Sequence, residues 1–403
     1  MRSYQVAYKR LLQFWDYNQP ATTLMRVRAF LRKYPDAHFV WMRLGNLLTD
    51  LARYEEAREA LSREIALYDP STVPHPLLYV WMGDSYRQGG NRPAAENWYR
   101  RAIEADPHNP EGYAALGKSL LQRGHPAEAQ TVLLQGTQCE KPLAEAWYWL
   151  GLVHRAQSQY LKAAKCLNRA IAIESDYPQA RHALTDVRKV IRRWEWDPPK
   201  GLSSGEAYEH MEELRADNNP AHNALLARDY LAKCPQNMAV WVSLGQELRR
   251  LYRYPKARRA LQISMRWRQR DGKPPWYVAH YQMGKLHRKS GEYNKAYDWH
   301  TRAIYAAPND AGPWILRGAL LAVWGRFEEA KAAHRRATFC EKGCRDEAWY
   351  NIGLILRAQE RFSDSATCFK RALAIDPDYK IAKRALRDVT AARAWERREM
   401  KEA

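Results

Sequence analysis

The chain has 403 residues, of which 46% are hydrophobic and 27% are charged. This composition excludes a disordered chain, because it holds enough apolar side chains to build a packed core. Lys and Arg number 65 against 45 Asp and Glu, a formal net charge of +20. Such a surface attracts acidic partners, nucleic acid or anionic lipid, and the charge alone does not choose between them.

The sequence lacks the features of secreted and membrane-spanning proteins. No apolar run approaches the roughly 18 residues of a membrane helix. The first residues mix Arg2, Lys9 and Arg10 with scattered apolar residues and form no hydrophobic signal. We therefore expect a soluble, cytoplasmic protein without membrane insertion, whose six cysteines are thiols.

The first predicted elements are a helix pair over about residues 3–34 and then a series of similar units. Each unit has a glycine after an aromatic and an apolar residue, at Gly45, Gly83, Gly117 and Gly151. The last three glycines are 34 residues apart, the period of a repeat. Twelve positions after each glycine stands a small residue, which allows two helices to approach closely: Ala57, Ala95, Ala129 and Ala163.

A boundary is predicted near the middle of the chain. A helix expected over about residues 178–194 runs into Trp194-Glu-Trp-Asp-Pro-Pro, and Lys200 to Gly205 is rich in Gly and Ser. The prolines prevent the helix from continuing, and the glycines loosen the chain. We expect a first array over residues 1–195, a linker over 196–205 and a second array over 206–403.

The second half repeats the first at a shift of 200 to 202 residues. Trp41-Met-Arg-Leu-Gly45 matches Trp241-Val-Ser-Leu-Gly245, and Cys139-Glu-Lys matches Cys340-Glu-Lys. A helix pair is expected over about 205–234, followed by four units and a basic closing helix from Lys380 to Lys401. The pattern predicts a tandem duplication of about twenty to twenty-two helices, with longer connections around residues 68–76 and 268–275.

The repeated unit resembles the tetratricopeptide repeat (TPR) family. The fullest match comprises Tyr79, Met82, Gly83, Tyr86, Gly90, Ala95, Tyr99, Ala102 and Pro107. Its first four residues are spaced i, i+3, i+4 and i+7, which places them on one helix face. The resemblance implies an all-α, right-handed superhelical solenoid of helix-turn-helix repeats, with the first helices lining a concave groove.

The resemblance also implies which residues line that groove. By repeat position they are Trp81, Arg87, Lys118, Tyr148, Trp149, Arg155, Arg249, Tyr281, Lys285, Arg288, Tyr350, Asn351 and Arg357. Further candidates are Asp84, Gln122, Leu152, Arg250, Lys289 and Leu354. The alternative for Tyr148, Leu152 and Arg155, which share one helix face, is simple packing against a neighbouring helix. The second half carries more excess positive charge than the first, which favours an acidic ligand.

Several motifs suggest chemistry and have a simpler explanation. Gly112-x4-Gly117-Lys118-Ser119 matches a phosphate-binding loop literally, but that chemistry needs a strand before the loop, and the repeat predicts helix there. His154 and His287 occupy a core position of the repeat, as do Cys166 and Cys368. Cys340 and Cys344 have no second pair at ligand spacing. We expect no enzyme activity, no metal and no cofactor.

These observations predict a non-enzymatic scaffold or adaptor. It would dock an extended or helical segment of an acidic partner protein in its concave grooves and assemble a multiprotein complex. The alternative is an RNA or ribonucleoprotein-binding protein that uses the same basic and aromatic residues. A purely structural subunit of a larger assembly remains open, as does the oligomeric state.

Overall fold

The computed structural model describes residues 5–402 apart from Phe14, Tyr17, residues 69–74, Pro142, residues 193–203, Ala216 and residues 271–275. In this part of the chain every regular element is a helix, and there are 22 of them. The predicted all-α class and the expected number of helices are therefore confirmed. Residues 196–203 of the expected linker lie outside the described residues, and residues 204 and 205 belong to a helix. Most residues of the two predicted longer connections also lie outside the described residues, although helix continues through residues 268–270.

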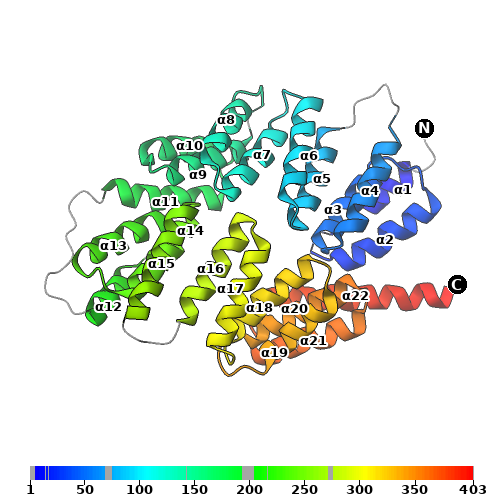
Figure 1. The fold of residues 1–403 in the computed structure, drawn as a ribbon. Helices are drawn as coiled ribbons and strands as arrows, with labels where there is room; N and C mark the ends of the chain where they lie inside the picture. Colours follow the sequence, from blue (N-terminus) through cyan, green and yellow to red (C-terminus); the bar gives the residue numbers. More distant parts are fainter. Residues whose placement is uncertain are drawn as a thin grey trace. The chain divides into compact units, whose positions relative to one another are not determined.

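By their contacts the residues form two compact units. Unit 1 comprises residues 1–98 and 307–403, and unit 2 comprises residues 99–306. Each unit therefore holds repeats from both halves of the sequence, and the division at residues 196–205 stays a prediction. Within each unit successive helices pack as pairs (Figure 1).

The helices of unit 1 are α1 (Gln5–Gln13), α2 (Pro20–Lys33), α3 (Val40–Asp50), α4 (Tyr54–Ala66), α5 (Pro76–Gln88), α18 (Ala311–Val323), α19 (Phe327–Thr338), α20 (Arg345–Ala358), α21 (Phe362–Ile375) and α22 (Lys380–Glu402). Helix α6 (Arg92–Ala105) spans the boundary. The helices of unit 2 are α7 (Pro110–Arg123), α8 (Pro126–Thr137), α9 (Ala144–Ala156), α10 (Tyr160–Ile173), α11 (Pro178–Arg192), α12 (Ser204–Leu214), α13 (Pro220–Lys233), α14 (Met238–Arg250), α15 (Tyr254–Arg270), α16 (Tyr277–Ser290) and α17 (Tyr293–Ala306).

The repeat glycine brings the two helices of a pair together. A Cβ atom on Gly117 would lie 2.3 Å from Cγ of Leu133, and one on Gly151 would lie 2.8 Å from Cγ of Leu167. Neither position has room for a side chain. The small residue twelve positions after the glycine, such as Ala163, is fully buried. The predicted close approach of the paired helices is thus confirmed.

In two repeats the glycine faces a histidine. Gly284 lies against the ring of His300 in unit 2, and Gly318 lies against the ring of His334 in unit 1. Both rings are buried. Burial lowers the pKa of His300 to about 3, with Arg288 and Lys285 adding to the shift, and lowers the pKa of His334 to about 4. Both imidazoles are therefore neutral in the folded chain at neutral pH.

The turn between the helices of a repeat contains one residue in the left-handed backbone region. Four repeats have glycine there, with φ between 73° and 89°: Gly90, Gly124, Gly291 and Gly325. The other four have side chains there, with φ between 59° and 66°: Ala52, Ser158, Tyr252 and Glu360. A side chain in this conformation costs about 1–2 kcal/mol. Glu360 accepts hydrogen bonds from Arg28 and Arg53, so its side chain holds α2 and α4 to the last repeat of unit 1.

Unit 2 contains a junction between the two halves of the sequence. Asp186 on α11 accepts hydrogen bonds from the backbone N–H groups of Ala221 and His222 in the first turn of α13, each at 3.1 Å. Arg155 on α9 donates to the same carboxylate at 3.1 Å. An acidic group at the N-terminus of a helix compensates unpaired backbone N–H groups there.

Unit 1 contains the duplicate of this junction. Asp388 on α22 accepts hydrogen bonds from the backbone N–H groups of Ala21 and Thr22 in the first turn of α2, each at 3.1 Å. Arg357 on α20 donates to Asp388 at 3.4 Å. Asp186 and Asp388 are both fully buried and stand 202 residues apart, which is the shift of the duplication. The two junctions therefore share one backbone arrangement.

Candidate functional site

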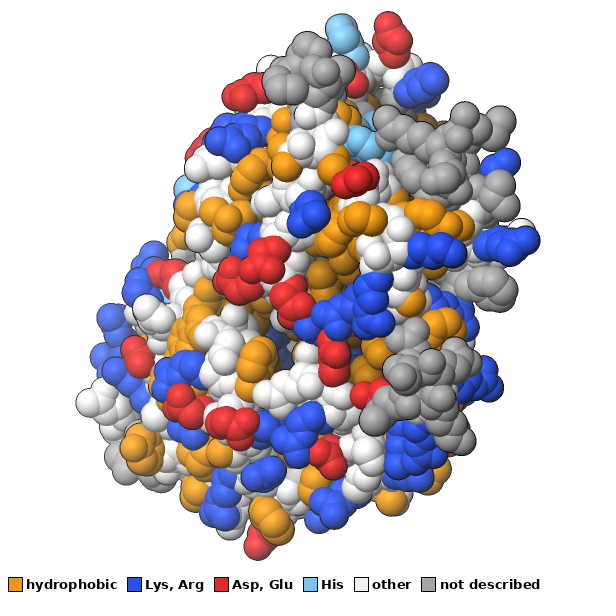
Figure 2. Space-filling model, turned by 90° about the vertical axis from the view of Figure 1, so that its right-hand side faces the viewer, with side chains coloured by type: hydrophobic (Ala, Val, Ile, Leu, Met, Phe, Trp, Pro, Cys, Tyr) orange, Lys and Arg blue, Asp and Glu red, His pale blue; other side chains and the backbone are white. Residues whose placement is uncertain are grey.

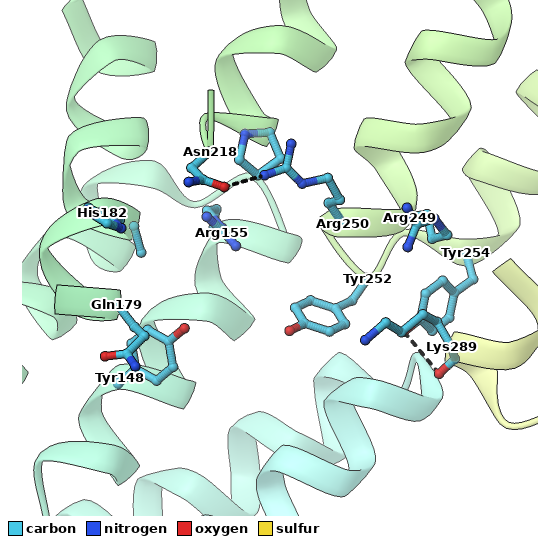
Figure 3. Close-up of a pocket in the computed structure, with 12 residues that line it drawn as sticks. Tyr148, Arg155, Gln179, His182, Asn218, Arg249, Arg250, Tyr252, Tyr254 and Lys289 are labelled. Atoms are coloured by element: carbon cyan, nitrogen blue, oxygen red, sulfur yellow. Dashed lines mark hydrogen bonds between the residues drawn. The ribbon is translucent and has the colours of Figure 1, made fainter. Parts of the chain in front are cut away.

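A cavity of about 360 Å³, here named the junction cavity, opens in unit 2 beside Asp186 and Arg155. Side chains from α9, α11, α14, α15 and α16 line it, together with the turn that leads into α13 (Figure 3). Its basic residues are Arg155, His182, Arg249, Arg250 and Lys289, and its aromatic residues are Tyr148, Tyr252 and Tyr254. No carboxylate is among the described residues that line it. The cavity is therefore suited to an anionic ligand.

Arg155 connects the cavity to the junction. Its guanidinium is buried and uses Nη1 to bind Asp186, while its Nε is buried without a hydrogen-bond partner. Burial raises the pKa of Asp186, whereas Arg155 and the backbone N–H groups of His222 and Ala221 act in the opposite direction. Arg155 thus stabilises the junction and keeps one donor unused.

Arg249 is a cation without a counterion. Its guanidinium makes no hydrogen bond or ion pair within the described residues, and its Nε is buried. Burial lowers the pKa of Arg249. Tyr254 and the Glu247 carboxylate act in the opposite direction, and the positive charges of Arg250 and Arg288 lower this pKa further. A guanidinium nevertheless stays charged. A buried charge of this kind is unfavourable until an anion joins it.

Arg250 is held in place by two acceptors. Its Nη1 lies 3.0 Å from Oε2 of Glu247, and its Nη2 donates to Oδ1 of Asn218 at 3.1 Å (Figure 3). Glu247 also binds Arg215 at 2.7 Å and is almost fully buried. Arg250 is thereby fixed at the edge of the cavity with much of its charge compensated.

Two tyrosine hydroxyl groups face the open space of the cavity. Tyr148 and Tyr252 point toward it from α9 and from the turn before α15 (Figure 3). Burial raises the pKa of Tyr148 to about 12 and also raises that of Tyr252, so both hydroxyls keep their protons at neutral pH. Tyr254 is already engaged, since its hydroxyl donates to the carbonyl of Gln122 at 2.9 Å. Tyr148 and Tyr252 are therefore available as hydrogen-bond donors.

The structure brings three of the predicted groove residues together in the junction cavity, namely Tyr148, Arg155 and Arg249, with the further candidates Arg250 and Lys289. Sequence reasoning missed the seven other lining residues, which are Gln179, His182, Ala183, Asn218, Pro220, Tyr252 and Tyr254. They lie on α11, in the connections before α13 and α15 and at the first residues of these two helices, outside the repeat positions that the family resemblance assigns to the groove.

The remaining predicted residues of unit 2 form two separate pairs. Lys118 lies 3.5 Å from the Glu145 carboxylate and 5.5 Å from the ring centre of Trp149, whose indole N–H also donates to Glu145. Lys285 lies 4.7 Å above the ring of Tyr281. Arg288 lies close enough to Arg249 and His300 to lower the pKa of both. None of these predicted residues lines the junction cavity.

The predicted residues of unit 1 lie in a different environment. Asn351 and Arg357 line a cavity of about 180 Å³ with largely apolar neighbours. Tyr350 packs between Phe369 and Tyr379, and Trp81 packs against a cluster of buried apolar side chains. Arg87 forms an ion pair of 2.9 Å with Asp84.

Most of the motifs that have a simpler explanation lie within helices of the repeats. Gly112 to Ser119 lies inside α7, and a Cβ on Gly112 would collide with Ile103, so this stretch packs as helix and forms no phosphate-binding loop. His154 and His287 are buried, and their Nδ1 atoms bind Gln159 and Glu292 respectively. Cys166 and Cys368 are buried. Among the described residues no three His, Cys, Asp or Glu side chains form a group that could hold a metal ion.

Comparison with known families explains this architecture. Sequence families described as tetratricopeptide repeat or TPR repeat match several stretches, which together cover more than half of the chain: residues 24–72, 83–124, 114–180, 279–313 and 346–379. The chain belongs to the tetratricopeptide repeat family. The predicted TPR identity is confirmed.

Curated relatives share only part of their length with this TPR chain. Tetratricopeptide repeat protein 7A of Homo sapiens is 28% identical over 139 residues, which cover 34% of this chain and 16% of that protein. Protein O-mannosyl-transferase TMTC3 of Homo sapiens is 26% identical over 161 residues, covering 36% and 17%. The probable biofilm formation methyltransferase WspC of Pseudomonas aeruginosa is 31% identical over 83 residues, covering 21% and 19%. The chain thus matches less than a fifth of the length of each.

Two solved structures match most of the chain at low sequence identity. A tetratricopeptide repeat protein from Parabacteroides merdae is 15% identical with a TM-score of 0.36, and the match covers 78% of this chain and 99% of that one. Yeast Tom70 is 13% identical with a TM-score of 0.39, covering 90% and 89%. Within the described residues, no helix is both long enough and apolar enough to span a bilayer.

Proposed function

We propose that this TPR protein is a non-enzymatic scaffold that binds an acidic segment of a partner protein, and that the junction cavity of unit 2 receives one of its acidic side chains. The observation that carries the proposal is the combination of four Lys and Arg side chains with no carboxylate among the described lining residues. Because the guanidinium of Arg249 has no counterion, an acidic side chain would offset its burial. The three tyrosines add contact area of the kind that anchors protein interfaces.

The alternative function is RNA binding, which the net charge of +20 favours. RNA needs a basic path that follows successive phosphates. On the face drawn in Figure 2, Lys and Arg side chains alternate with Asp and Glu side chains and form no continuous basic path. The four Lys and Arg side chains of the junction cavity gather at one place, which suits a single anionic group, and this supports the protein partner over RNA.

The two functions can be separated with two labelled probes and the full-length chain. One probe is a fluorescein-labelled octapeptide of alternating Glu and Leu, and the other is fluorescein-labelled octauridylate. We expect the peptide to bind, and Arg249→Glu to weaken it at least tenfold in fluorescence anisotropy. The control is Arg259→Glu, which makes the same charge change at an exposed position of α15.

Two results would overturn the proposal. One is a peptide affinity that is the same in the wild type and in Arg249→Glu, or no peptide binding at all. The other is tight binding of octauridylate that falls steeply with salt and is lost in Arg249→Glu, because counterion release is the signature of phosphate-backbone contacts. The second result would establish the RNA function instead.

A further inference from the structure

We propose that the junction cavity recognises a phosphoryl group on a side chain of the partner protein, so that phosphorylation of the partner controls its binding. This inference rests on the proposed function and specifies the ligand of the same site. Two features of unit 2 point to it: the donors that converge on the cavity, and the replacement of those donors in the duplicate junction of unit 1.

The donors in the cavity exceed what one carboxylate can accept. Arg249 lines the cavity, and the four N–H groups of its two terminal guanidinium nitrogens have no partner within the described residues. The hydroxyls of Tyr148 and Tyr252 face the same space. A phosphoryl group presents three strong acceptor oxygens and a charge of about −1.5 to −2 at neutral pH, whereas a carboxylate presents two oxygens and one charge.

The charge of the cavity also favours a doubly charged ligand. Arg155 and Arg250 are each paired with a carboxylate, Asp186 and Glu247. Arg249 has no such partner among the described residues, so it is the cation of the cavity that a ligand would neutralise, and Lys289 adds positive charge to the surroundings. In a cavity lined by four Lys and Arg side chains, an anion of about two charges is attracted more strongly than a carboxylate of one charge.

The duplicate junction shows that these donors are not needed to build the fold. At the shift of 200 residues, Arg249 corresponds to Thr49, Arg250 to Asp50 and Tyr252 to Ala52. The junction of unit 1 nevertheless keeps the same contacts between its buried aspartate, its arginine and a helix N-terminus. Arg249, Arg250 and Tyr252 are therefore additions to a scaffold that folds without them, whereas Tyr148 and Arg155 have the counterparts Tyr350 and Arg357 in unit 1.

The environment of Asp50 confirms that unit 1 lacks this property. Burial raises the pKa of Asp50, and the nearby carboxylate of Asp84 raises it further, while Arg357 lowers it. An anion bound beside Asp50 would be repelled by a carboxylate, whereas the corresponding position in unit 2 is the cation Arg250. The phosphoryl site is thus confined to unit 2.

Tyr252 gives a third indication. It adopts φ of 61° at a turn position where four other repeats have glycine. A tyrosine there costs about 1–2 kcal/mol of backbone strain relative to glycine. Its ring lines the cavity and its hydroxyl faces the open space, so the strained position supplies a ligand donor.

The test compares three peptides that differ in one side chain, with the full-length chain in each titration. The peptides are Leu-Glu-phosphoserine-Glu-Leu, the same peptide with serine, and the same peptide with glutamate at the centre. We expect the phosphorylated peptide to bind at least tenfold more tightly than the glutamate peptide. Inorganic phosphate should displace it only at far higher concentration, because free phosphate lacks the flanking contacts.

The decisive variant is Arg249→Thr, which introduces the residue that the first half has at this place. Its fold is expected to persist, with an unchanged or higher thermal midpoint, because an unpaired buried cation is removed. It should bind the phosphorylated peptide no better than the glutamate peptide. The control Arg259→Thr removes the same charge from an exposed position of α15 and should bind like the wild type.

The outcomes distinguish this inference from the proposed function. Equal affinity for the phosphorylated and glutamate peptides, both weakened by Arg249→Thr, would refute the phosphoryl site and leave the acidic-segment scaffold standing. If inorganic phosphate binds as tightly as the phosphorylated peptide, the ligand of the cavity is a free anion and not a partner protein. If octauridylate at equal concentration displaces the peptide, the ligand of the cavity is RNA. If no peptide binds, both proposals are refuted.

Discussion

Acidification should destabilise unit 2 through His300, whose ring is fully buried against Gly284. Its pKa is about 3 in the folded chain and 6.5 in the unfolded chain. Between pH 7 and pH 5 the unfolded chain therefore binds a proton that the folded chain does not bind, and the free energy of unfolding falls as the pH falls. At 1.36 kcal/mol per pH unit below 6.5, the loss at pH 5 is about 2 kcal/mol.

The assay is thermal unfolding followed by circular dichroism at pH 7 and at pH 5. In His300→Leu the contribution disappears, and the leucine should fit because Leu133, Leu167 and Leu261 occupy the same place in other repeats. For a unit of this size, about 2 kcal/mol corresponds to about 4–8 °C. Between pH 7 and pH 5 we expect the thermal midpoint of the wild type to fall by about 4–8 °C more than that of His300→Leu. A control, His108→Leu at an exposed position, should lose as much as the wild type. The reasoning is refuted when the thermal midpoint of His300→Leu falls as far on acidification as that of the wild type.

Three further predictions concern stability and the phosphate-loop motif. Gly151→Ala should lower the free energy of unfolding by about 2 kcal/mol in urea titrations, since its Cβ would meet Leu167, whereas Gly205→Ala in open space should cause no loss; equal behaviour of the two would contradict the packing argument. Burial raises the pKa of Glu292, but hydrogen bonds from Lys295, His287 and Ser290 outweigh it and lower the pKa to about 2. Glu292→Gln should therefore cost about 2 kcal/mol at pH 7, and the difference from the wild type should shrink as the pH falls from 4.5 toward 2; a difference independent of pH would argue against this ionic contribution. Magnesium ATP should not raise the thermal midpoint of the wild type or of Lys118→Ala. If it stabilises the wild type and this effect is lost in Lys118→Ala, the chain binds nucleotide through Lys118.

Features that recur in every repeat could be predicted from the sequence. The contact of Gly117 with Leu133 forms within one helix pair, only 16 residues apart, so its steric requirement repeats with the period of the chain. The burial of His154 and Cys166 follows from their repeat positions in the same way.

The junction cavity could be predicted only in part. Tyr148, Arg155 and Arg249 stand at groove positions of the repeat, and the family resemblance identified them. The rest of the cavity depends on the contact of Asp186 with Ala221, which joins the end of one half to the start of the other, and no repeat period describes that contact. Asp186 and Asp388 stand 202 residues apart, which is the shift of the duplication. This recurrence is the signal in the sequence that could have revealed the junction.

The central claim is that a duplicated TPR fold carries one functional cavity, and hydrogen exchange with mass spectrometry tests it most directly. The full-length chain is measured with and without a saturating concentration of the phosphorylated peptide. The account predicts slower exchange around residues 148–155 and 249–254 of unit 2, and no change around the equivalent residues 350–357 and 49–54 of unit 1. Protection of the unit 1 residues, or of neither set while the peptide remains bound, would contradict it.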